Sequence, residues 1–211
     1  SIMVALDDGV VDTSYQVETG CGVWPMYGRE MKDHNWRGGG YGLLTLPKTL
    51  MMSSNIGVSR IIDDHYRNDP EKFVRGIYRT GIADNLQIPL VGSCPARIRM
   101  PKKNARGEWV NWSHTALPWM SIGYESQVPP ISTLAFYNAI ANNGKMMRPR
   151  FVKQVIKNGE VIMDFPPEVM RESICKESTL HKLQTILEHV VSQGLGKKAG
   201  SKSFKVAGKT G

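Results

Sequence analysis

The chain has 211 residues, of which 41% are hydrophobic, and a formal net charge of +8 at pH 7. This length and composition predict a single globular domain or a large part of one. The basic charge could suit nucleic acid, but the only cationic cluster, Lys197 to Lys205, has one aromatic residue and no series for stacking bases. We therefore expect no nucleic-acid partner.

The cysteines and histidines indicate neither a metal site nor a disulfide framework. The three cysteines lie far apart without a Cys-x-x-Cys pair, and the five histidines show no spacing typical of metal ligands. We expect no metal and no cofactor. The apolar run from Ile2 to Leu6 is too short for a signal peptide or a membrane span.

The first residues have the spacing of a short helix. Ile2, Met3 and Leu6 share one face, and Gly9 suits the end of a helix. Because no capping residue precedes this pattern, we expect it to be the last part of a longer helix. We expect the chain to be truncated at both ends.

Helical spacing returns between residues 45 and 81. Thr45 can cap a helix that has Pro47 in its first turn, and Ser53-Ser54-Asn55 falls where this helix ends. A second helix is predicted from Ile56 to about Tyr66, and a third from Asp69-Pro70 to Gly81. Residues 82 to 111 have no lasting period and are predicted to be irregular.

The second half of the chain is predicted to mix helices with a hairpin. One helix should run from Pro129-Pro130 to Asn143-Gly144, and the last from a cap at Ser178 or Thr179 to Gly194. Between them, Asn158-Gly159 predicts a type I′ turn between two short strands. Residues 203 to 211 at the end of the chain are predicted to form a terminal strand.

Two short motifs carry the chemistry. Lys209-Thr210-Gly211 follows an apolar stretch: Lys209 adds positive potential, Thr210 can bind a carboxylate, and Gly211 lets a substrate approach the backbone. Ser53-x-Asn55 is the only Ser-x-Asn in the chain and lies at a helix end. Taken alone, Ser53 and Asn55 are better explained as helix caps, and only the two motifs together, in this order, favour a catalytic role.

These motifs resemble two of the three that mark penicillin-binding proteins and serine β-lactamases. Three longer stretches, "LLTLPKTLMMSSNIGVSRI", "MSIGYESQVPPISTLAFYNAIANNGKMMRP" and "VAGKTG", are similar to the transpeptidase domain of class B penicillin-binding proteins. The resemblance covers nearly the whole chain. It implies an α/β (α+β) transpeptidase fold, of which residues 1–211 form a partial domain, mainly its helical part with one hairpin and a terminal strand.

The resemblance also implies a function for the intact protein. It implies a D,D-transpeptidase that cross-links peptidoglycan stem peptides through a serine acyl-enzyme and is acylated by β-lactams. Ser53, Asn55 and Lys209 would be catalytic, and Thr210 and Gly211 would bind substrate. The implied partners are a glycosyltransferase and proteins of the divisome or elongasome, at the periplasmic or extracytoplasmic face of the membrane.

The third motif of the family, Ser-x-x-Lys, supplies the nucleophile and precedes Ser-x-Asn. The only match in this chain, Ser173-Ile174-Cys175-Lys176, follows Ser53 and leads into the last helix, so we interpret it as a chance match. The true motif is expected a few residues before Ser1. We therefore expect residues 1–211 alone to be inactive.

Two other functions remain open at this point. A β-lactam sensor or a serine β-lactamase would carry the same motifs, and the sequence does not separate hydrolysis from transpeptidation. A basic nucleic-acid-binding module is the alternative from a different class, and it would predict steeply salt-dependent binding.

Overall fold

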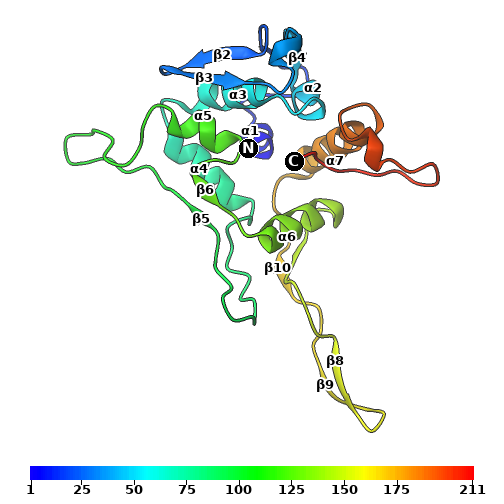
Figure 1. The fold of residues 1–211 in the computed structure, drawn as a ribbon. Coiled ribbons are helices and arrows are strands. Elements are labelled where there is room, and N and C mark those ends of the chain that lie inside the picture. The colour runs from blue at the N-terminus through cyan, green and yellow to red at the C-terminus, as the bar shows by residue number, and fades with distance from the viewer.

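Helices build most of the interior of the computed structural model, which describes all 211 residues (Figure 1). The chain has seven α-helices, and the other six lie around α1. Their bounds are α1 Ile2–Asp7, α2 Leu46–Met51, α3 Asn55–Tyr66, α4 Pro70–Arg79, α5 Ala116–Ser121, α6 Pro130–Ala141 and α7 Glu177–Ser192, and two short 3₁₀ helices are η1 Trp36–Gly38 and η2 Lys197–Ala199.

The strands form five separate antiparallel pairs rather than one sheet. The pairs are β1 (Gln16–Glu18) with β4 (Leu43–Thr45), β2 (Val23–Met26) with β3 (Arg29–Lys32), β5 (Arg97–Ile98) with β6 (Ser126–Gln127), β7 (Met146–Met147) with β10 (Val169–Arg171), and β8 (Gln154–Lys157) with β9 (Glu160–Asp164). None of these pairs is wide enough to form a hydrophobic layer of its own, so the helices supply the core.

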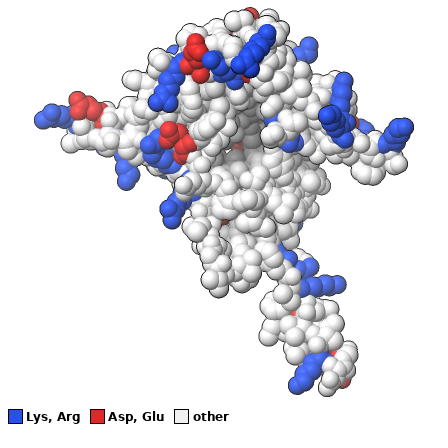
Figure 2. All heavy atoms as spheres, viewed as in Figure 1, with Lys and Arg blue, Asp and Glu red and all other residues white.

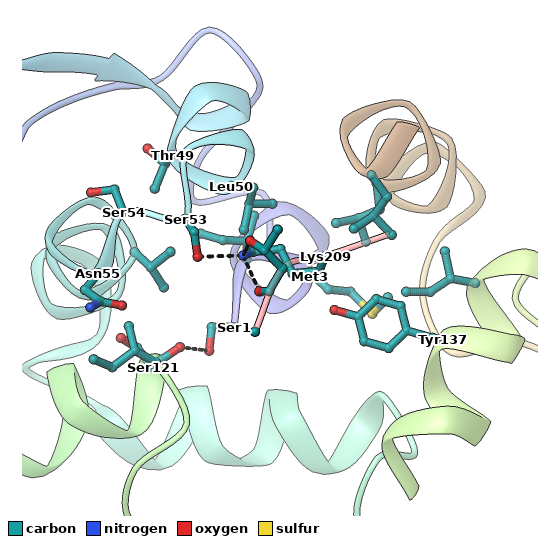
Figure 3. A pocket seen from close by; sticks show the side chains of 18 of the residues that line it. Ser1, Met3, Thr49, Leu50, Ser53, Ser54, Asn55, Ser121, Tyr137 and Lys209 are labelled. Atoms are coloured by element: carbon teal, nitrogen blue, oxygen red, sulfur yellow. Dashed lines mark hydrogen bonds between the residues drawn. The ribbon is translucent and has the colours of Figure 1, made fainter. Parts of the chain in front are cut away.

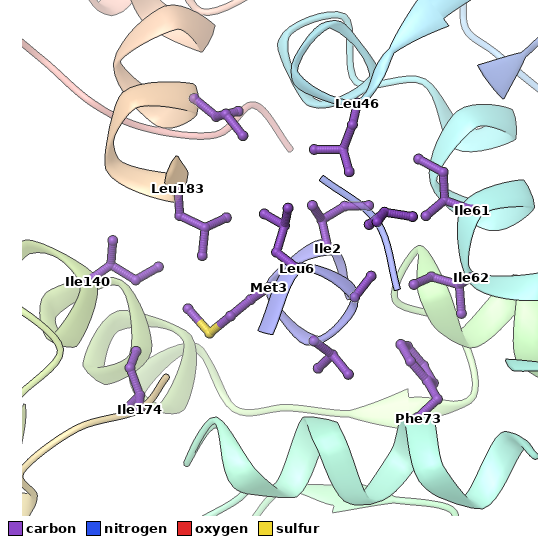
Figure 4. Close-up of a cluster of buried hydrophobic side chains, with 14 of the residues drawn as sticks. Ile2, Met3, Leu6, Leu46, Ile61, Ile62, Phe73, Ile140, Ile174 and Leu183 are labelled. Atoms are coloured by element: carbon purple, nitrogen blue, oxygen red, sulfur yellow. The ribbon is translucent and has the colours of Figure 1, made fainter. Parts of the chain in front are cut away.

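Helix α1 lies at the centre of that core (Figure 4). Every residue from Ile2 to Leu6 is buried, and Ala5 is completely inaccessible. A helix that is apolar on all sides is stable only when protein surrounds it. The side chains labelled around it are Leu46 of α2, Ile61 and Ile62 of α3, Phe73 of α4, Ile140 of α6, Leu183 of α7, and Ile174 from the segment that precedes α7.

Most predicted helices are confirmed. Helix α2 begins after Thr45 with Pro47 in its first turn, although the Thr45 hydroxyl makes no capping hydrogen bond. Helix α4 is capped by Asp69, whose carboxylate accepts a backbone N–H of the first turn. After α6, Asn143 and Gly144 both have left-handed backbone angles, as the Asn-Gly pair predicts.

The predicted cap of the last helix is wrong. Helix α7 begins at Glu177, so Lys176 occupies the capping position and Ser178 and Thr179 lie in the first turn. Asp7, at the end of α1, explains the early start: its carboxylate accepts the backbone N–H of Lys176 at 2.8 Å, and its carbonyl accepts the Lys176 ammonium at 2.7 Å. A contact distant in sequence thus fixes where this helix begins.

The strand predictions are confirmed in part. Asn158 and Gly159 have φ values of 53° and 84° and form the turn between β8 and β9. A second hairpin, β2–β3, turns at Tyr27-Gly28 and was missed because Tyr-Gly is a weaker turn signal than Asn-Gly. The predicted terminal strand is wrong, since residues 205–211 have no neighbouring strand and the Gly208 N–H is bonded instead to the carbonyl of Leu187.

The β8–β9 hairpin projects away from the helices (Figure 1). Every residue of both strands is exposed.

None of the helices combines the length and the apolar composition that crossing a bilayer requires.

Helices α1 and α4 are in close contact at Gly76, which generates a test of the core. A Cβ added at Gly76 would lie 2.3 Å from Cγ1 of the buried Val4. We expect Gly76→Ala to lower the free energy of unfolding of the domain by about 1–3 kcal/mol, because overpacking costs more than the helix propensity gained. Urea unfolding followed by circular dichroism measures the change. In a Val4→Ala background the cost of Gly76→Ala should shrink, and an equal cost in both backgrounds would contradict the contact.

Candidate active site

A sharp turn between α2 and α3 presents Ser53. Helix α2 ends at Met51 and α3 begins at Asn55, so only three residues connect the two helices. Ser53 has a φ of 49°, in the left-handed region that residues with a side chain seldom adopt. Ser54 then caps α3, because its hydroxyl accepts the backbone N–H of Gly57 at 2.9 Å.

The side chain of Lys209 reaches this turn from the other end of the chain (Figure 3). Its Nζ donates a hydrogen bond of 2.7 Å to Oγ of Ser53, and two more to the carbonyl oxygen and hydroxyl of Thr210 at 2.9 and 3.2 Å. These acceptors are all uncharged. Burial lowers the pKa of the Lys209 amine below the ordinary lysine value of 10.5, because a low-dielectric environment disfavours the charged form.

Asn55 lies one residue beyond the cap, at the start of α3. Its side-chain N–H donates to the carbonyl oxygen of Lys32, at the end of β3, with a distance of 3.0 Å. This bond fixes the plane of the amide, while the side chain remains part of the cavity lining.

These groups surround a cavity of about 490 Å³ (Figure 3). The cavity lies between α1, the α2–α3 turn, α5, α6, α7 and the end of the chain, and Figure 2 shows a hollow on this face with mostly uncharged atoms around it. The apolar part of its lining includes Ile2 and Met3 of α1, Leu50 of α2, Phe136 and Ile140 of α6, and Leu183 and Leu187 of α7. A mainly apolar cavity with a few convergent polar groups is typical of a ligand site.

Two further polar groups line the cavity. The hydroxyl of Ser1 donates to the carbonyl of Ser121 at 2.6 Å. The phenol of Tyr137 points into the cavity from α6 (Figure 3), and burial raises its pKa, so the hydroxyl stays protonated and able to donate.

The structure brings all the predicted site residues together. Ser53, Asn55, Lys209, Thr210 and Gly211 all line the one cavity, although 156 positions separate Ser53 from Lys209. Their catalytic and binding roles remain predictions.

The Ser173-x-x-Lys176 sequence lies outside this cavity. The Ser173 hydroxyl donates to the carbonyl of Cys175, and the Lys176 ammonium donates to the carbonyl of Asp7. The lysine amine is therefore directed to a backbone carbonyl rather than to the serine. This geometry agrees with our interpretation of the sequence as a chance match.

Sequence reasoning missed Asp33. This carboxylate is 1% exposed and accepts hydrogen bonds from the Ser54 hydroxyl at 2.7 Å and from the backbone N–H of Ile56 at 3.0 Å. It lies 20 residues before Ser53 in a loop with no recognised motif. Only the folded chain shows that its carboxylate is bonded to the residues next to Ser53 and Asn55.

The arrangement is suited to moving a proton. Because Lys209 donates to Oγ of Ser53, the hydroxyl proton of Ser53 is free to be donated to a group in the cavity, and the Lys209 ammonium can then return a proton to the serine oxygen. The same ammonium, partly shielded from water, would attract a substrate carboxylate beside the Thr210 hydroxyl.

The burial of Lys209 predicts a shifted titration. Nuclear magnetic resonance of the lysine side chains in the full-length protein should show the Lys209 amine losing its proton below pH 10.5, because burial penalises the ammonium form. Loss of the signal in Lys209→Arg would assign it. Titration at or above 10.5 would show that water or an acidic group stabilises the charge.

Comparison with known proteins gives a consistent set of relatives. A family model described as penicillin binding protein transpeptidase domain matches residues 1–211. The chain is 26% identical over 212 residues to the probable peptidoglycan D,D-transpeptidase PbpC of Pseudomonas aeruginosa, and 28% identical over 211 residues to the peptidoglycan D,D-transpeptidase FtsI of Escherichia coli. These alignments cover 100% of this chain but 33% and 31% of the relatives, so it spans about a third of their length.

Solved structures show the same fold. The transpeptidase domain of Burkholderia pseudomallei penicillin-binding protein 3 is similar with a TM-score of 0.76 and 27% identity, over 99% of this chain and 56% of that one. A peptidoglycan glycosyltransferase from Burkholderia ambifaria is similar with a TM-score of 0.75 and 26% identity, over 100% of this chain and 59% of that one. The mixed α/β fold expected from the sequence is thereby confirmed.

Proposed function

Because this chain belongs to the penicillin-binding protein transpeptidase family, we propose that it is part of a peptidoglycan D,D-transpeptidase that cross-links stem peptides in bacterial cell-wall synthesis. The observation that carries the proposal is the hydrogen bond from Lys209 to Ser53 beside Asn55, at one cavity. Relatives over the whole chain are named as enzymes of this kind, which supports the same reaction here.

The substrate of this reaction is a peptide that ends in D-alanyl-D-alanine. Lys209 and the Thr210 hydroxyl would hold its terminal carboxylate, because they lie together and combine a positive charge with a hydroxyl donor. The side chain of Asn55 would bind an amide of the substrate backbone. The apolar lining contributed by α6 and α7 would exclude water from the peptide bond that breaks.

We place the acylated serine outside residues 1–211, since the only Ser-x-x-Lys sequence of the chain lies away from the cavity. That serine attacks the penultimate carbonyl and loses its proton to the motif lysine. The peptide bond breaks, and the Ser53 hydroxyl passes a proton to the leaving nitrogen, which departs as D-alanine. The amine of a second stem peptide then attacks the ester, forms the cross-link and returns the proton to the serine.

This mechanism has consequences for ligands and location. β-Lactams would acylate the same serine, since a transpeptidase binds them as it binds the terminal dipeptide. Action on peptidoglycan places the enzyme at the extracytoplasmic face of the membrane. We propose a glycosyltransferase and proteins of the divisome or elongasome as its partners, because cross-linking needs newly made glycan strands.

The role of Ser53 can be tested by acylation with a fluorescent penicillin. We expect Ser53→Ala in the full-length protein to slow labelling by about 100-fold or more, because it removes the proton relay to the leaving nitrogen. Gel fluorescence against time measures the rate.

The matched control for this experiment is Ser173→Ala, which should label as fast as the wild type because Ser173 lies outside the cavity. Residues 1–211 alone should not be labelled. Rapid labelling of Ser53→Ala, or labelling of the isolated chain at Ser173, would refute the assignment.

A further inference from the structure

The turn that carries Ser53 is tied to the dipeptide Lys32-Asp33. Three consecutive residues each donate one hydrogen bond to it: the Ser54 hydroxyl and the Ile56 backbone N–H to the two oxygens of the Asp33 carboxylate, and the Asn55 amide to the carbonyl of Lys32. Residues from 21 to 23 positions earlier in the chain therefore hold the turn from outside.

The Asp33 carboxylate is well suited to this task. It is buried at the N-terminus of the 12-residue helix α3, where backbone N–H groups have no partner within the helix and the helix dipole favours negative charge. Hydrogen bonds to a carboxylate are stronger than those between neutral groups. Asp33 thus acts as a second cap of α3, supplied by the loop after β3.

Ser53 depends on such support because its own conformation is unfavourable. Its φ of 49° persists in a non-glycine residue only where the surroundings enforce it. On one side the turn is fixed by α2, whose carbonyls of Leu50 and Thr49 accept the N–H groups of Ser53 and Ser54. On the other side, the bonds to Asp33 fix the residues that follow.

Ser54 has no free capacity for chemistry. It is 1% exposed, its hydroxyl proton is donated to Asp33, and its oxygen accepts the N–H of Gly57. The space around this bond is filled, since a Cβ on Gly57 would lie 2.6 Å from Thr49 Cγ2. A displacement of Asp33 would therefore pass through Ser54 to Ser53 rather than be absorbed locally.

We propose that Asp33 is a positioning residue: it acts through Ser54 and Ile56 to hold the Ser53 hydroxyl in reach of Lys209 and the Asn55 amide toward the cavity. This inference rests on the transpeptidase function proposed above. Asp33 itself touches no substrate, since it is buried behind the turn and does not line the cavity.

The test compares two isosteric changes at buried carboxylates of the full-length protein. Asp33→Asn replaces the carboxylate that is bonded to Ser54 and Ile56 by a neutral amide. Asp63→Asn makes the same change at a buried carboxylate of α3 that lies away from the turn and accepts a hydrogen bond from the Tyr27 hydroxyl. Labelling with a fluorescent penicillin gives a rate and a final amplitude. We expect Asp33→Asn to slow labelling by about 10- to 100-fold at unchanged amplitude, because a small displacement of a catalytic group is costly. Asp63→Asn should label at the wild-type rate.

Other outcomes would overturn the inference. An equal slowing in both variants would indicate general destabilisation, and a reduced amplitude at the wild-type rate would indicate only a loss of folded protein. Asp33→Asn combined with Ser54→Ala should be no slower than the slower single variant, since the two side chains act as one unit. Additive losses would show that Asp33 acts by another route.

A second measurement does not depend on activity. In Asp33→Ala, the backbone N–H of Ile56 should lose its protection from hydrogen exchange while that of Ile62, in the middle of α3, keeps it. If the wild-type protein is not labelled by penicillin, the proposed function fails and the exchange result still decides the role of Asp33. If labelling is normal but Ile56 stays protected, the positioning role alone is wrong.

Discussion

Helix α1 is stable only when its apolar surface is buried, and the packing of the other helices around it meets that requirement. Six residues are too few for a stable helix in water, so α1 exists because the surrounding helices enclose its apolar surface. The same contacts give those helices a common place to pack, and the strand pairs are too narrow to provide one. Even the start of α7 follows from α1, through the bonds from Lys176 to Asp7.

The cavity lies between α1 and the helices that enclose it. Helix α7 covers one side of α1, and near its end the Leu187 carbonyl accepts the N–H of Gly208. This bond and the ion pair between Lys205 and Glu188 tie the last residues to α7, and beyond them Lys209 meets Ser53 at the α2–α3 turn. The site is therefore assembled from the two ends of the chain and its middle, and each part is held by a different helix.

The site combines a small polar cluster with an apolar lining, and the apolar surroundings strengthen the electrostatic interactions that the cluster makes. Lys209 is held by uncharged oxygens in a partly dry environment, which lowers its pKa and strengthens its attraction for an anion in the cavity. Behind the turn, Asp33 is a buried charge of the opposite sign, satisfied by donors from α3 and its cap. At this site, the buried carboxylate lies where a helix begins and the half-buried ammonium lies near the end of the chain.

The local elements and the identity of the motif residues could be predicted from the amino-acid sequence. The spacing of apolar residues predicted α3, α4 and α6, Asn158-Gly159 predicted a hairpin, and the order of Ser53-x-Asn55 and Lys209-Thr210-Gly211 predicted a shared site. Such signals are local, because helix periods, caps and tight turns depend on neighbours within a few residues. Three features could not be predicted in this way: Asp33 supports the turn, α7 starts at Glu177, and residues 205–211 form no strand. Each of them depends on contacts between residues far apart in the sequence, which exist only in the folded chain.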